Sequence, residues 1–190
     1  MESNAKVILP VTYPMITSYT HYANLLSILC NKKETEGWIY NNFINLWGTE
    51  YEDDFFIRFG PWDIRKNCPF VDTSYIDEFF IANTFKSITD YIISAIQLGY
   101  YVYINYDQFY IPLSNLYLKH HSIHHLFIYG YNKTDKEFYI ADFFANGKYS
   151  YGSASFEDVQ RSINCAFEDL KGNDMLCELI KPVNGSINLT

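Results

Sequence analysis

The sequence predicts a single α+β domain in which an N-terminal helix packs on a mostly antiparallel β-sheet. Two observations support this fold class: a helical pattern comes first in the chain, and most strand patterns follow it, separated by turns. Hydrophobic residues make up 48% of the 190 residues, which is enough for a sizeable core. Residues 1–182 are expected to form the domain and residues 183–190 a flexible tail.

The first predicted helix covers residues 18–30, because its apolar residues recur with the spacing of one helical face. Thr17 or Ser18 is the expected N-cap, since both side chains accept hydrogen bonds from the first turn of a helix. A second helix is predicted over residues 34–46, although its glycine weakens the pattern.

The clearest helical pattern covers residues 87–99. Ser87 is suited to cap its first turn, and Gly99 is suited to end it in a left-handed conformation. A last helix is predicted over residues 156–170. These two helices bracket the part of the chain in which most of the strands are expected.

Strands are predicted where short runs of aromatic and β-branched residues are bounded by turn residues. The polar stretch NKTDK is expected to join two of them, residues 125–131 and 137–144, as a hairpin. Residues 64–75 are predicted to form a loop, and residues 74–85 fit either a helix or a strand. The other predicted strands are residues 53–62, 100–107 and 175–181.

The charge of the chain argues against two classes of partner. A net charge of −8 and a pI near 5.0 disfavour nucleic acid and anionic membranes, because phosphate binding needs a clustered positive field. No run of about 18 apolar residues predicts a transmembrane helix. The scattered cysteines are expected to be free thiols of a cytoplasmic protein, mostly buried in packing: Cys30, Cys68, Cys165 and Cys177.

Four of the five histidines lie in HHSIHHLFIYGY, at the entry to a predicted strand. If NKTDK closes a hairpin, residues whose numbers sum to about 268 lie opposite one another. His124 then lies one diagonal step from Asp142 on the same face. An aspartate there would fix the imidazole tautomer and stabilise its protonated form, as a general base requires. The alternative is a hydrogen-bonded polar pair without a catalytic role.

A metal site is the second interpretation of this segment. On a helix, HHxxHH would place His120, His121, His124 and His125 as i, i+4 pairs, which is a zinc-binding spacing. The segment directly precedes a strand, however, and no acidic or cysteine ligand follows at zinc-site spacing. The sequence therefore predicts no metal and no cofactor, and surface histidines explain at least two of the four.

The segment from His124 to Asp142 resembles the His–Asn/Asp half of papain-like cysteine enzymes. In those enzymes, as in double-glycine leader peptidases, the catalytic histidine typically precedes a glycine by six positions, as His124 precedes Gly130. With the preceding helix and YYVYINYDQFYIPL, the pattern is similar to the butirosin biosynthesis protein H N-terminal family, over about residues 10–145. This resemblance implies a papain-like fold. The type member of that family moves an acyl group from a carrier protein to an amine.

The nucleophile departs from the family pattern. The family places a cysteine at the start of the first helix, whereas this chain has Thr17 or Ser18 there. Ser18 is the candidate nucleophile, with His124 as base and Asp142 as the orienting residue. Ser18 could equally be a helix cap, and His21, one turn later, could line the same cleft or face solvent.

The resemblance implies an acyl transferase or hydrolase of secondary-metabolite or nonribosomal peptide biosynthesis. It would move an acyl or aminoacyl group from a carrier-protein thioester to an amine or water, through an acyl-enzyme or by direct aminolysis with His124 as base. The alternative is an inactive homologue that binds a peptide or a biosynthetic intermediate, and a third possibility is a leader-peptide peptidase. The expected partner is an acyl carrier protein or peptidyl thioester.

Overall fold

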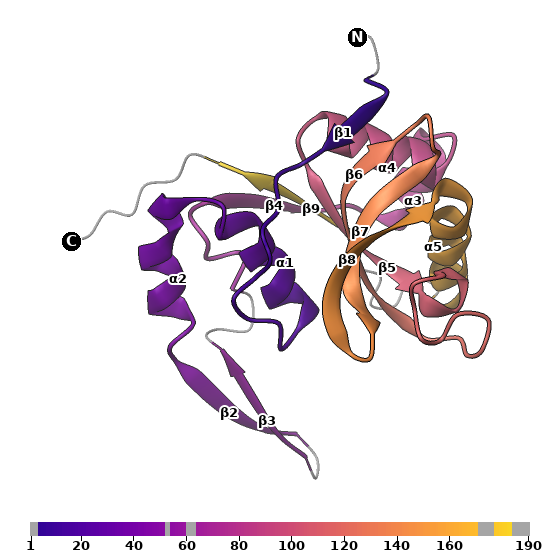
Figure 1. Ribbon diagram of the computed structural model, residues 1–190. Coiled ribbons are helices and arrows are strands. Elements are labelled where there is room, and N and C mark those ends of the chain that lie inside the picture. Colours follow the sequence, from indigo (N-terminus) through magenta and orange to yellow (C-terminus); the bar gives the residue numbers. More distant parts are fainter. Residues whose placement is uncertain (1–3, 52–53, 60–63, 171–176, 184–190) are drawn as a thin grey trace.

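The computed structural model describes residues 4–51, 54–59, 64–170 and 177–183. Helices and strands alternate irregularly along these residues (Figure 1). The helices are α1 (Thr20–Leu29), α2 (Glu36–Asn42), α3 (Glu78–Thr84), α4 (Ile88–Gln97) and α5 (Phe156–Leu170). The strands are β1 (Lys6–Ile8), β2 (Leu46–Tyr51), β3 (Asp54–Phe59), β4 (Val71–Tyr75), β5 (Tyr101–Asp107), β6 (Ile123–Asn132), β7 (Glu137–Ala145), β8 (Lys148–Ser155) and β9 (Cys177–Pro182).

One antiparallel sheet organises the molecule, which confirms the α+β class. Its seven strands run in the order β4-β9-β5-β6-β7-β8, with β1 paired to β6. Strands β2 and β3 form a separate two-stranded hairpin that projects beyond α2 (Figure 1). Within the part of the chain that the structure describes, no helix is both long enough and apolar enough to cross a membrane.

Helices cover the sheet on both faces (Figure 1). Side chains alternate along each strand, so neighbouring residues enter different cores. Tyr106, Leu126 and Ile140 enter the core formed with α3, α4 and α5. Tyr103 and Phe127 enter the other core, formed with α1 and α2. This alternation places the neighbouring residues His124 and His125 on different faces.

The predicted hairpin register is confirmed. Phe127 lies opposite Ala141, and Ile128 lies opposite Ile140. An irregularity between Ile128 and Gly130 then shifts the register by one residue. A Cβ on Gly130 would lie 2.7 Å from the backbone oxygen of Val7, so the close approach of β1 requires a glycine there.

The helices at residues 87–99 and 156–170 are confirmed as α4 and α5. Ser87 accepts a hydrogen bond from the backbone N–H of Asp90, and Gly99 has φ +84°. The predicted N-cap of α1 is wrong: Tyr19 occupies that position, and its side chain makes no capping hydrogen bond. Thr17 and Ser18 lie before the cap, because the helix starts two residues later than its apolar pattern suggests.

Three other elements differ from the predictions. The predicted loop at residues 64–75 ends in strand β4, whose pairing with β9 comes from a segment about 100 residues later in the chain. The second predicted helix is shorter, because β2 begins at Leu46. Strand β8 was not predicted, since its Ser- and Gly-rich sequence lacks an apolar run. The predicted tail lies, from residue 184 onward, outside the described residues.

Candidate functional site

The hairpin of β6 and β7 brings His124 and Asp142 together. Nδ1 of His124 lies 2.7 Å from Oδ2 of Asp142, as the predicted register requires. The carboxylate is fully buried, whereas 37% of the histidine side chain is exposed. Among the described residues, Nε2 of His124 has no hydrogen-bond partner.

Tyr106 of β5, which no sequence motif marks, completes this site. Its hydroxyl donates a hydrogen bond of 2.5 Å to the same Oδ2 of Asp142. Within the described part of the chain, Oδ1 of Asp142 is buried without a hydrogen-bond partner. The hydrogen bond to Asp142 and its negative charge favour a positive charge on the imidazole of His124. We call His124, Asp142 and Tyr106 the His124 site.

The pKa of His124 reflects two opposing effects, burial and the neighbouring carboxylate of Asp142. Burial alone would lower it, but the hydrogen bond to Asp142 and the negative charge of that carboxylate outweigh burial and raise the pKa above its usual value. The adjacent His125 behaves in the opposite way. Burial, reinforced by the charge of His124, lowers its pKa to about 4. At neutral pH only His124 is therefore suited to accept and release a proton.

The two histidines point to different faces of the sheet. His124 alternates in phase with Leu126, which enters the core on the α4 and α5 side. His125 alternates with Phe127 and stacks on Tyr103, with ring centroids 5.2 Å apart, on the α1 side. His124 and helix α1 thus belong to opposite faces.

This arrangement does not bring the predicted nucleophile to the base. Ser18 is exposed, and among the described residues it has no hydrogen bond to His124 or Asp142. The hydroxyl at the start of α1 that does contact the sheet is that of Thr20, whose Oγ1 lies 2.8 Å from the hydroxyl of Tyr103. Thr17 is half-buried. The catalytic role assigned to Ser18 stays a prediction.

His21 lies beside two tyrosines at the start of α1. Its ring stacks on Tyr19 with centroids 5.6 Å apart and lies 4.1 Å from the centroid of Tyr22. It is half-buried, and it has a further interaction within the molecule. His21 is therefore part of the aromatic packing around α1, on the face opposite the His124 site.

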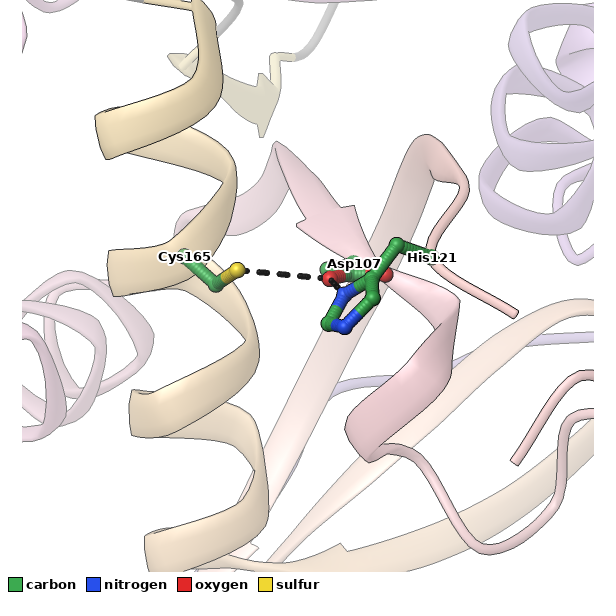
Figure 2. Close-up of side chains that lie close together, drawn as sticks. All are labelled: Asp107, His121 and Cys165. Atoms are coloured by element: carbon green, nitrogen blue, oxygen red, sulfur yellow. Dashed lines mark hydrogen bonds and ion pairs between the residues drawn. The ribbon is translucent and has the colours of Figure 1, made fainter. Parts of the chain in front are cut away.

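A second cluster joins Asp107, His121 and Cys165 (Figure 2). Oδ2 of Asp107 lies 2.5 Å from Nδ1 of His121 and accepts a hydrogen bond of 3.3 Å from the thiol of Cys165. The three side chains come from the end of β5, the segment before β6, and α5. Their potential ligand atoms all lie within 4.8 Å of one another.

The environment of Asp107 stabilises its charge. Burial opposes ionisation, but hydrogen bonds from His121 and from the backbone N–H groups of Phe109 and Ser122 lower the pKa of its carboxyl group. Burial and the Asp107 carboxylate raise the pKa of the Cys165 thiol. In the absence of a metal, the thiol therefore stays protonated and donates a hydrogen bond to the carboxylate.

The four neighbouring histidines do not form the predicted alternative metal site. β6 begins at Ile123, so the segment is not the helix that an HHxxHH site requires. His120 is exposed, and each of the other three contacts a different partner: Asp107 for His121, Asp142 for His124 and Tyr103 for His125.

No acidic or cysteine ligand stands at zinc-site spacing from these histidines in the sequence, but the fold brings Asp107 and Cys165 to His121. Asp107 and Cys165 are 14 and 44 residues away from it in the chain, so no local motif relates them. Asp107 comes near His121 only once β5 and β6 pair, and no local signal points to Cys165.

A comparison of the chain with protein-family models and with curated proteins found no match.

Proposed function

We propose that the chain is an acyl-transfer enzyme of the butirosin biosynthesis H-like, papain-like group, with His124 as its general base. It moves an acyl or aminoacyl group from a carrier-protein thioester to an amine or to water. The observation that supports this proposal is the 2.7 Å contact between half-exposed His124 and fully buried Asp142. A buried carboxylate that orients a histidine whose other nitrogen is open is the arrangement that proton transfer requires.

Transfer proceeds directly from the thioester to the acceptor. The amine nitrogen attacks the thioester carbonyl carbon, and Nε2 of His124 takes the proton that the nitrogen loses. The C–S bond then breaks, and His124 returns the proton to the departing thiolate. Asp142 stays ionised throughout and stabilises the imidazolium that forms between the two steps. The amide and the free thiol are the products, and no oxidant or metal is consumed.

Direct transfer fits the described contacts better than an acyl-enzyme does. A serine nucleophile needs a base within hydrogen-bond reach, and Ser18 lies at the start of the helix on the other face of the sheet. Each cysteine is described, and no hydrogen bond joins any of the four thiols to His124. The packing of α1 on an antiparallel sheet supports a papain-like architecture, although the helix start and His124 occupy different faces.

The proposal can be tested with acyl N-acetylcysteamine thioesters, which mimic the end of a carrier-bound acyl group. The full chain is incubated with a panel of these donors and a primary amine, and products and intact protein mass are followed by mass spectrometry. We expect amide and free thiol to form without a stable acyl adduct. His124→Gln should abolish turnover, whereas His120→Gln, at an exposed position four residues away, should not.

The same experiment separates the mechanisms. An acyl adduct that disappears in Ser18→Ala would establish an acyl-enzyme and overturn direct transfer. Donor that stays intact with every amine, in the wild type as in His124→Gln, would overturn the enzymatic proposal.

An inactive binding homologue is the second candidate function. The exposed position of Ser18 before the cap of α1 favours it, because the family nucleophile is missing at the helix start. This candidate predicts saturable binding of hydrophobic peptidyl thioesters without their consumption. Isothermal titration calorimetry with a peptidyl N-acetylcysteamine thioester, followed by recovery of the ligand, measures both properties.

A further inference from the structure

We propose that Asp107, His121 and Cys165 form a binding site for one zinc ion (Figure 2). The site lies apart from the His124 site and does not depend on the acyl-transfer proposal. It combines the three ligand types that zinc uses in proteins: a carboxylate oxygen, an imidazole nitrogen and a thiolate sulfur.

The donor atoms already converge on one small volume. All three lie within 4.8 Å of one another, and in Figure 2 the imidazole of His121 and the sulfur of Cys165 both approach the carboxylate of Asp107. Zinc–ligand bonds of about 2.0–2.3 Å place neighbouring ligand atoms about 3–4 Å apart. The hydrogen-bonded cluster therefore needs only small side-chain shifts to accommodate an ion.

The carboxylate is held in the orientation that a ligand needs. Oδ1 of Asp107 accepts hydrogen bonds from the backbone N–H groups of Phe109, at 3.0 Å, and Ser122, at 3.1 Å. Both bonds leave Oδ2 directed at His121 and Cys165. Outer hydrogen bonds of this kind orient the ligands of natural metal sites and contribute to their affinity.

The other two ligands are also positioned by their surroundings. The ring of His121 stacks on Phe109, with centroids 4.1 Å apart and an interplanar angle of 11°. Cys165 lies on α5, which is fixed to the same strand end by a hydrogen bond of 2.6 Å from the Ser162 hydroxyl to the Asp107 backbone oxygen. Three different segments thus meet at one prearranged point.

Solvent reaches this point, so a water molecule can supply a fourth ligand. The His121 side chain is 57% exposed. Cys165 also lines a surface hollow on α5 together with Glu157, Glu168 and Arg161, in which two carboxylates outnumber one guanidinium and favour the approach of a cation. Three protein ligands and one water make up the open type of zinc site.

Zinc replaces the protons that now hold the cluster together. Binding forms Zn–O, Zn–N and Zn–S bonds, releases the thiol proton of Cys165 to solvent, and uses the neutral form of His121. The hydrogen bond from the thiol to Asp107 is lost in the process. A cysteine nucleophile is a different use of the same atoms, but the thiol donates its hydrogen bond to the carboxylate and not to the histidine base that a nucleophile needs.

The test uses the full chain, freed of metal with a chelator and titrated with zinc chloride. We expect about one equivalent of zinc by calorimetry. Cobalt(II) should bind in its place with a thiolate charge-transfer band in the near ultraviolet. Cys165→Ser keeps a hydroxyl donor for Asp107, so it should fold, and it should lose the cobalt band and at least about 100-fold of the zinc affinity. His121→Asn should lower the affinity similarly.

Cys30→Ser and His120→Asn are the matched controls, because they remove one thiol and one imidazole outside the cluster. Both should bind zinc like the wild type. Absence of zinc binding in the wild type would overturn the proposal. It would equally be overturned by binding that survives in Cys165→Ser and His121→Asn, or that depends on His124 instead. Unfolding midpoints in urea show whether each variant is folded, so a loss of affinity is not confused with a loss of structure.

Discussion

Two histidine–aspartate pairs, whose histidines lie three residues apart in the chain, differ in what surrounds the carboxylate. In the pair of His121 and Asp107, both carboxylate oxygens accept hydrogen bonds, two from backbone N–H groups and two from side chains. In the pair of His124 and Asp142, one oxygen accepts both bonds, and the other is buried without a partner in the described residues. The Asp107 carboxylate is therefore saturated with hydrogen-bond donors. The Asp142 carboxylate has donors on one oxygen only, and His124 is one of the two.

This difference indicates different uses for the same residue types. A saturated aspartate between a histidine and a cysteine holds three side chains at fixed positions, as a metal site needs. An aspartate bound in the described residues to a histidine and a tyrosine has the imidazole as its one partner that can become positively charged, which suits the proposed role of His124 as a base. Substitutions that act on one pair alone test this difference.

The largest effect is expected from His124→Gln. Loss of a general base lowers the rate of catalysed reactions by about 10²–10⁴-fold. We expect the rate of amide formation from an acyl thioester to fall within this range, and urea denaturation should show that the variant is folded. His120→Gln serves as the matched control. A fall of less than tenfold in His124→Gln would remove His124 from the chemistry and with it the proposed difference between the pairs.

The next largest effect concerns stability. Asp107→Asn places an amide NH₂ group where donors already point at the carboxylate, whereas in Asp142→Asn the NH₂ group can occupy the side that lacks a donor. Given about 1–3 kcal/mol for each disrupted bond to a buried charge, we expect a loss of about 3–4 kcal/mol for Asp107→Asn and about 1–2 kcal/mol for Asp142→Asn. Urea denaturation of metal-free protein measures both values.

Asp72→Asn, at an exposed position of β4, removes the same charge and should change the free energy of unfolding by less than about 0.5 kcal/mol. Equal losses for Asp107→Asn and Asp142→Asn would contradict the distinction between a saturated and an unsaturated carboxylate.

A third prediction concerns the titration of His124 and His125. The unfolded-state pKa of both is about 6.5. NMR should find the pKa of folded His124 above this value and that of folded His125 at about 4. His124 then contributes stability below pH 6.5 that is lost as the pH rises through its folded pKa. His125 is held neutral, so its contribution is lost as the pH falls from about 6.5 towards 4.

Activity should follow His124, because only the neutral imidazole accepts a proton. The rate should rise with pH through the raised pKa of His124, and in Asp142→Asn this rise should move to lower pH, since the negative charge that raises the pKa is gone. An unchanged pH profile in Asp142→Asn would show that the carboxylate does not tune the base.

The sequence predicted the elements whose signals are local. Ser87 caps the start of α4, and Gly99 follows its end. The register of the β6–β7 hairpin follows from the length of one turn, so the contact between His124 and Asp142 could be predicted. Strand β4 could not be predicted, because it forms by pairing with β9 near the other end of the chain.

The same reasoning explains the site residues that were missed. Tyr106 and Asp107 are neighbours in a strand of almost uniformly buried residues, and nothing local shows that one binds Asp142 and the other His121. For Cys165 the sequence predicts only a packing role, because it does not show where α5 lies relative to β5. The N-cap of α1 was predicted wrongly for a different reason: Ser18 is a good capping residue, but the helix begins after Tyr19.

The smallest effect is expected from Tyr106→Phe, which acts only on the His124 site. It removes the hydroxyl that binds Oδ2 of Asp142, and a buried hydrogen bond of this kind contributes about 1 kcal/mol to stability. With one donor fewer, the negative charge of Asp142 acts more strongly on His124, so the pKa of the imidazole should rise and the rise in rate should move to higher pH. This shift is opposite in sign to that of Asp142→Asn, so the two variants check each other. If Tyr106→Phe lowers the pKa of His124, the tyrosine supports the histidine directly, and Asp142 is not the residue through which it acts.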